Sequence, residues 1–142
     1  MAQVYACRMS DPTAFVVITR YRVEDFEAWL PGARAALAPL VTQDWCIGGD
    51  ICAAVDDPHL AVITTHWPSV GAYRRAMSSF EVKMHTVPLL SMSIDEPTAF
   101  EVIHHNGPDG EREFPSARAH DADSIGLGAA AAAEVRPRLV TD

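Results

Sequence analysis

The chain has 142 residues, of which 49% are hydrophobic and 21% charged, and its formal net charge is −8. This is the composition of one globular domain with a sizeable core. The acidic balance disfavours binding to nucleic acid or to anionic lipid, because both require a basic protein face.

Segments for membrane insertion and secretion are not predicted. No apolar run approaches the roughly 20 residues that span a bilayer. The first residues lack the basic start and long apolar stretch of a signal peptide. Three cysteines, Cys7, Cys46 and Cys52, form an odd and sparse set that does not indicate a disulfide framework. We therefore expect a cytoplasmic protein that does not bind membranes.

The first half of the chain predicts a strand followed by an interrupted helix. Residues 13–23 are rich in β-branched and aromatic side chains and form the first predicted strand. Residues 24–41 carry apolar side chains at helical spacing, but Pro31 and Gly32 stand within them. We expect a short turn and then a helix that begins near Pro31, where a missing N–H costs nothing.

The second half predicts two strands, one helix and a final strand. Residues 44–55 form a strand with a bulge or bend at Gly48–Gly49, and residues 59–67 form the next strand. Ser69 is the expected N-cap of a helix that ends before Pro88. The apolar stripe of this helix consists of Val70, Tyr73, Met77, Phe80 and Met84. Residues 91–105 complete the set as a strand bent at Pro97.

The order β-α-β-β-α-β predicts an α+β fold with a ferredoxin-like antiparallel sheet. The segment "PTAFVVI" at 12–18 recurs as "PTAFEVI" at 97–103 and agrees with this pattern. We expect an N-terminal extension over 1–11, the domain over 12–105, and a C-terminal tail over 106–142 that is mobile or contacts a partner. Both faces of the first and third strands carry apolar residues, which predicts a homodimer covering the second face, or a sheet face closed over a ligand cavity.

Four segments resemble the antibiotic biosynthesis monooxygenase (ABM) family of dimeric α+β barrels. They are "TRYRV", "GGDICAAVDDP", "HWPSVGAYRRAMSS" and "VPLLSMSIDEPTAFEV", within Pro12 to His104. The most specific element is a tryptophan at the end of the third strand followed six residues later by a tyrosine, here Trp67 and Tyr73. The resemblance implies a monooxygenase that oxidises a small aromatic, polyketide-like substrate such as an anthrone or hydroquinone with O₂ and no cofactor.

Within that reading, each candidate residue has a chemical role. Trp67 donates a hydrogen bond to reduced oxygen, because an indole N–H donates without accepting a proton. His66, with an unperturbed pKa of ~6.5, is the first candidate base, and Asp50 is the second. Tyr73 binds substrate. Ile63 lies on the Trp67 side of its strand, and Met77 and Phe80 share the stripe of Tyr73, so these three are further predicted substrate contacts.

Several patterns limit these expectations. Strand alternation sends His66 and Trp67 to opposite faces. Ile63 stands where the oxygenases tend to carry asparagine, and Ala76 and Met77 stand where haem-degrading relatives carry an iron ligand. No histidine has a metal-ligand spacing. Arg20 and Arg22 are expected to pair with Asp50 or Glu101. Two alternatives stay open: a non-redox isomerase or cyclase, and a non-catalytic ligand-binding or stress-related barrel.

Overall fold

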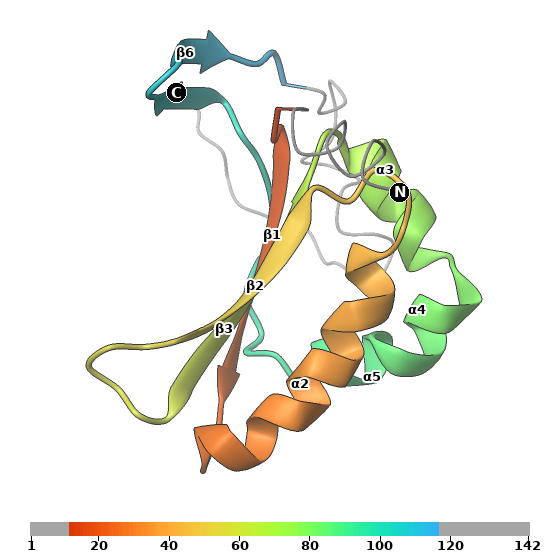
Figure 1. Cartoon of the computed structure of the whole chain (residues 1–142), viewed down its shortest axis with the longest axis vertical. Helices are drawn as coiled ribbons and strands as arrows, with labels where there is room; N and C mark the ends of the chain where they lie inside the picture. Colours follow the sequence, from red (N-terminus) through yellow and green to blue (C-terminus); the bar gives the residue numbers. More distant parts are fainter. Residues whose placement is uncertain (1–11, 117–142) are drawn as a thin grey trace, which may run out of the picture.

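A computed structural model describes residues 12–116, in which an antiparallel sheet carries helices on one face (Figure 1). Hydrogen bonds join four strands in the order β2-β3-β1-β4. This confirms the predicted α+β, ferredoxin-like fold. The elements are β1 Phe15–Arg22, α2 Phe26–Val41, β2 Gly48–Ala53, β3 Leu60–Trp67, α3 Val70–Met77, α4 Phe80–His85, α5 Val87–Leu90, β4 Ala99–Glu101, β5 His104–Gly107 and β6 Gly110–Glu113.

The core lies between the sheet and the helices. Alternate residues of β1 and β3 are buried there, and their neighbours face the other side of the sheet. Paired residues share a face, so the register Phe15–Trp67, Val17–Thr65 and Thr19–Ile63 builds the floor of this core. We call this side the helix-covered face, and the opposite side the open face.

The helix α2 corrects the prediction around Pro31. It runs without interruption from Phe26 to Val41, and the side chain of Asp25 caps it by accepting hydrogen bonds from the backbone N–H groups of Glu27 and Ala28. Pro31 is exposed. The carbonyl that loses its partner at this proline therefore has access to water, which makes the proline tolerable inside the helix.

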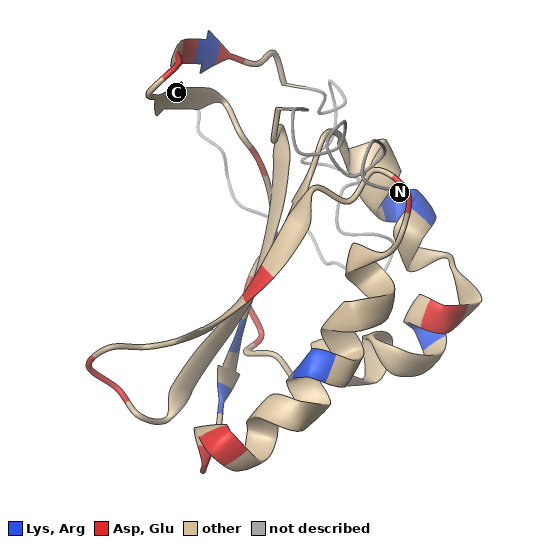
Figure 2. Ribbon diagram, in the orientation of Figure 1, with Lys and Arg blue, Asp and Glu red and all other residues tan. Residues whose placement is uncertain are grey.

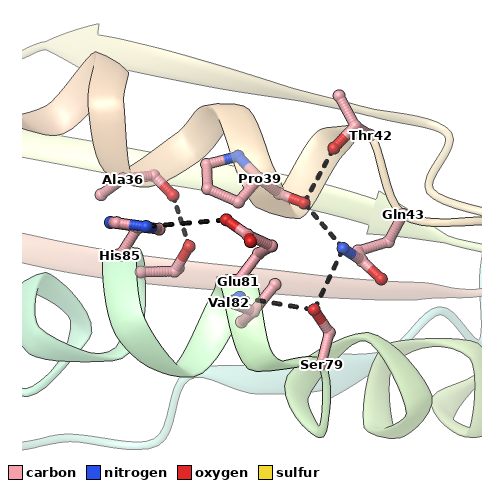
Figure 3. Close-up of polar contacts among 9 residues, drawn as sticks. Ala36, Pro39, Thr42, Gln43, Ser79, Glu81, Val82 and His85 are labelled. Atoms are coloured by element: carbon pink, nitrogen blue, oxygen red, sulfur yellow. Dashed lines mark hydrogen bonds and ion pairs between the residues drawn. The ribbon is translucent and has the colours of Figure 1, made fainter.

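The predicted helix over 70–84 is two helices, because Ser78 and Ser79 separate α3 from α4. The hydroxyl of Ser79 accepts from the backbone N–H of Val82 and so begins α4. Figure 3 shows the polar contacts that hold α4 against α2, including the amide of Gln43, which donates to the Pro39 carbonyl and to Ser79. The hydroxyl of Thr86 also donates to the Ala36 carbonyl over 2.6 Å.

Pro88 does not end the helical region as predicted. It lies in the first turn of the short helix α5, a position where its missing N–H has no intrahelical partner to lose.

The strand β2 is shorter than predicted and has no bulge. Its pairing with β3 is regular from Gly48–His66 to Ala53–Ala61. Gly49 serves a different purpose there. A Cβ at this position would lie 3.0 Å from both Leu37 Cδ1 and the Thr64 carbonyl, so glycine permits the close approach of α2 to the sheet.

The predicted fourth strand also differs. Only Ala99–Glu101 forms β4, and residues from His104 onward turn away into a β5–β6 hairpin with Gly107 paired to Gly110. The first part of the expected tail is therefore ordered as a hairpin. The extension over 1–11 and the tail beyond 116 lie outside the described residues.

Charged side chains lie mainly at the edges of the fold. Lys and Arg are spread over separate elements in Figure 2. Arg20 lies 3.7 Å from Glu96 and Arg22 lies 2.8 Å from Asp57, so the predicted partners Asp50 and Glu101 are wrong. Within residues 12–116, no helix has the length and apolar character needed to cross a bilayer.

Candidate functional site

Three residues from three strands form a row at one end of the helix-covered face. Phe15 on β1 pairs with Trp67 on β3 and, on its other side, with Glu101 on β4. Because directly paired residues project to the same face, Glu101, Phe15 and Trp67 lie side by side across the sheet. Trp67 and Phe15 are buried, and Glu101 is half-buried.

Trp67 is packed completely inside the protein. Its exposed fraction is 0%, and its indole Nε1 donates a hydrogen bond to Thr65 Oγ1 over 2.9 Å. Thr65 precedes it by two residues and therefore points to the same face. The proposed donor of the site thus has a partner in the structure, and Thr65 supplies the polar group next to it that the sequence prediction lacked.

Tyr73 connects this row to α3. Its ring centroid is 5.5 Å from that of Trp67, at 67°, and 5.5 Å from that of Phe15. These are edge-to-face and tilted contacts of the kind that aromatic rings prefer. Burial raises the pKa of Tyr73, and the neighbouring Tyr21 adds a smaller increase. The pair of Trp67 and Tyr73 predicted from the sequence is therefore in contact, with Phe15 as a third member.

A second buried polar group lies further along β1. The hydroxyl of Tyr21 donates to Thr19 Oγ1 over 2.9 Å, and the hydroxyl of Thr19 donates to the Ile63 carbonyl over 3.4 Å. Burial raises the pKa of Tyr21, an effect that the hydrogen bond to Thr19 partly offsets. Thr19, Thr65 and Tyr21 are thus the hydroxyl-bearing side chains that this core floor offers in place of an asparagine.

A hollow of about 190 Å³ opens beside the aromatic row. Phe15, Glu101 and Phe114 form part of its wall, and the turn Pro68–Val70 between β3 and α3 forms another part. Val70 packs against the cluster that contains Trp67. Phe15 therefore separates the hollow from the ring of Tyr73.

His66 and Asp50 lie on the open face, as alternation predicts for His66. His66 Nε2 is 3.6 Å from Asp50 Oδ2, and the Thr64 hydroxyl is 3.4 Å from the same carboxylate oxygen. The Asp50 side chain is 67% exposed. The sheet itself separates these two candidate bases from Trp67, so the structure brings His66 and Asp50 together but not with the aromatic row.

The three further predicted substrate contacts have different environments. Ile63 is buried in the cluster around Tyr21, whereas Met77 is partly buried against the cluster around Trp67. Phe80 is 71% exposed because it begins α4, beyond the break in the predicted stripe. Met77 therefore packs beside the aromatic row, whereas Phe80 faces solvent.

Among the described residues, no group of three or more His, Cys, Asp or Glu side chains could hold a metal ion.

The residue of this site that sequence reasoning missed is Glu101. Its place follows from the pairing of Glu101 with Phe15, a register that the sequence alone does not determine.

The sequence matches no family model and no curated protein, whereas the fold matches solved structures. SnoaB, a cofactor-independent oxygenase from Streptomyces nogalater, is 18% identical with a TM-score of 0.54, over 64% of this chain and 94% of that one. A conserved protein from Methanosarcina mazei Go1 is 19% identical with a TM-score of 0.52, over 68% and 97%.

A proposed antibiotic biosynthesis monooxygenase from Chloroflexus aurantiacus J-10-fl is 15% identical with a TM-score of 0.51, over 67% of this chain and 98% of that one. Identities this low establish the likeness at the level of fold. The chain therefore has the α+β fold of the antibiotic biosynthesis monooxygenases, as the resemblance in its sequence predicts.

Proposed function

We propose that the protein is a cytoplasmic, cofactor-independent monooxygenase that oxidises an aromatic, polyketide-like substrate such as an anthrone or hydroquinone. For an anthrone the reaction balances without a cofactor. The methylene carbon loses its two hydrogens and gains one oxygen atom of O₂ as a carbonyl, and the other oxygen atom leaves as water. The electrons come from the substrate after a base has removed a proton.

The observation that carries this proposal is the contact of Trp67, Tyr73 and Phe15 beside an open hollow. Aromatic walls favour a planar aromatic ligand and exclude water from the reacting atoms. In this proposal Phe15 contacts the substrate in the hollow, and Tyr73 and Met77, the substrate contacts suggested by the sequence, pack in the cluster behind it. Trp67 exchanges its hydrogen bond to Thr65 for one to the reduced oxygen, which stabilises developing negative charge.

Oxygen consumption by the purified protein tests the proposal. We expect uptake of O₂ with anthrone or a hydroquinone and, for Trp67→Phe, a fall in kcat of about 10²-fold, since removal of one such donor typically costs 10²–10³-fold. Trp29→Phe is the matched control, because Trp29 packs on Tyr21 in the other cluster. Unchanged turnover in Trp67→Phe, or no O₂ uptake with any of these substrates, would contradict the proposal.

A non-catalytic ligand-binding barrel is the second candidate. It is favoured by the complete burial of Trp67, whose donor is already paired with Thr65. Titration of the intrinsic tryptophan fluorescence with an anthraquinone separates the two functions. Tight binding without turnover, and equal binding by Trp67→Phe, would select the non-catalytic barrel.

We also propose that the open face of the sheet binds the same face of a second copy of the chain. Val16, Ile18 and Val62 stand on this face, and Phe100 beside them is 43% exposed. Within residues 12–116 all helices lie on the other side of the sheet (Figure 1). Sedimentation equilibrium should give twice the chain mass of 15.4 kDa, and a monomer at every concentration would contradict the dimer.

A further inference from the structure

We infer that Glu101 is the catalytic base that removes the proton from the substrate in the hollow at the end of the sheet. This inference rests on the proposed function, because the oxidation must begin with a deprotonated substrate. The two bases suggested by the sequence, His66 and Asp50, are separated from the aromatic row by the sheet. A base on the helix-covered face is therefore required, and Glu101 is placed there by its pairing with Phe15.

The lining of the hollow makes Glu101 distinctive. It is the only ionisable residue among the described residues that form the wall, and most of the others are apolar. The one other polar side chain, that of Ser69, accepts a hydrogen bond from the backbone N–H of Ala72 as the N-cap of α3. Among the described residues of the wall, a substrate group that enters this hollow therefore meets one carboxylate and mostly apolar side chains.

Ser116 holds this carboxylate in position. Its hydroxyl donates to Glu101 Oε1 over 2.6 Å. The bond engages one oxygen of the carboxylate and limits its rotation. Ser116 is thus a positioning residue in this inference.

The size of the hollow limits what it can take. An apolar cavity of about 150 Å³ accommodates benzene, and the hollow measures about 190 Å³. One aromatic ring, with the acidic C–H or O–H at its edge, matches this volume. The rest of a larger polycyclic substrate would extend out of the hollow. The ligand class is therefore a phenol, hydroquinone or anthrone that presents one edge.

The step itself is a proton transfer. The substrate C–H or O–H bond breaks, its electron pair stays on the substrate as a carbanion or phenolate, and the proton forms an O–H bond with the Glu101 carboxylate. Nothing is oxidised or reduced in this step. Oxidation follows when the anion passes electrons to O₂, and the proton leaves Glu101 to the reduced oxygen or to water.

Anaerobic hydrogen–deuterium exchange isolates this step from the chemistry of O₂. With anthrone in D₂O, the wild-type protein should accelerate loss of the methylene proton signal in NMR spectra. Glu101→Gln keeps the size of the side chain and an oxygen for Ser116, and should lower the accelerated rate at least about 100-fold, since a general base contributes 10²–10⁴-fold. Asp50→Asn and His66→Gln on the open face are matched controls and should exchange at the wild-type rate.

A second variant, Glu101→Ala, tests whether a folding defect explains the result for Glu101→Gln. Glu101→Ala should lose the exchange and regain part of it, with saturation, when formate is added. Wild-type exchange rates in Glu101→Gln, or no acceleration by the wild-type protein, would overturn the inference. Exchange that depends on Glu101 without any consumption of O₂ would sustain this role and refute the oxygenase, so the two failures are distinguishable.

Discussion

The two faces of the sheet carry different chemistry although they are built from the same strands. On the helix-covered face, Thr65 and Trp67 are buried and bonded to each other. On the open face, their chain neighbours Thr64 and His66 surround the exposed carboxylate of Asp50. A shift of one position along β3 moves a side chain from a packed interior to a surface that a second copy of the chain is proposed to cover.

Because of this difference, residues that are adjacent in the sequence need not belong to the same site. His66 and Trp67 are adjacent but lie on opposite sides of the sheet. Glu101, which is 34 residues from Trp67, shares its row through Phe15. The polar groups that can act on one substrate are therefore those of one face, and they come from three strands.

The largest expected effect concerns the open face, which is proposed to bind a second copy of the chain. Ile18→Glu should convert the dimer to a monomer, because a charge placed in a covered apolar interface costs several kcal/mol and every 1.4 kcal/mol is about tenfold in Kd. We expect the dimer Kd to rise at least about 100-fold in sedimentation equilibrium. Val55→Glu, at a fully exposed position in the β2–β3 turn, is the control. A dimer that survives Ile18→Glu would place the interface elsewhere.

The strands could be predicted because β-branched and aromatic residues are concentrated in β1 and β3, and their alternation could be predicted because successive side chains of any strand point to opposite faces. The prolines were misjudged because their effect depends on tertiary context. Pro31 is tolerated where water reaches the helix, and Pro88 lies in the first turn of the helix that begins at Val87. The break between α3 and α4 depends on Ser79, whose hydroxyl caps α4. The apolar stripe continues across this break and therefore predicted a single helix.

The site was predicted only in part for a related reason. Trp67 and Tyr73 were found because the resemblance to the ABM family marks this pair, and because the two residues lie only six positions apart. Glu101 was missed because its place depends on the register between the first and last strands, which single-sequence patterns do not determine. The hollow also depends on Phe114 and Pro115, which belong to the segment expected to be a tail.

A smaller effect should appear at alkaline pH and report on the helix-covered face alone. Tyr21 and Tyr73 have raised pKa values because burial disfavours their charged forms. The unfolded chain therefore loses these protons first, near pH 10, while the folded protein still holds them. Stability from this source is complete below pH 10 and falls as pH rises toward the folded pKa values.

Urea denaturation between pH 8 and pH 11 measures this decline. The double variant Tyr21→Phe and Tyr73→Phe should show a shallower loss of unfolding free energy with pH, even though Tyr21→Phe also costs about 1 kcal/mol at pH 8 through its lost hydrogen bond. An equal slope in the double variant and the wild type would mean that neither hydroxyl is protected by the fold.

The smallest expected effect belongs to Asp50 and tests the comparison most directly. Its carboxylate stands on the edge strand β2, at the rim of the proposed interface; it is 67% exposed and lies 3.6 Å from His66 Nε2, a geometry in which an ion pair contributes less than about 1 kcal/mol. Asp50→Asn should therefore change the unfolding free energy by less than about 0.5 kcal/mol and leave kcat for oxygen uptake near the wild-type value. A large loss of kcat with unchanged stability would mean that the substrate reacts on the open face, and the assignment of catalysis to the helix-covered face would then be wrong.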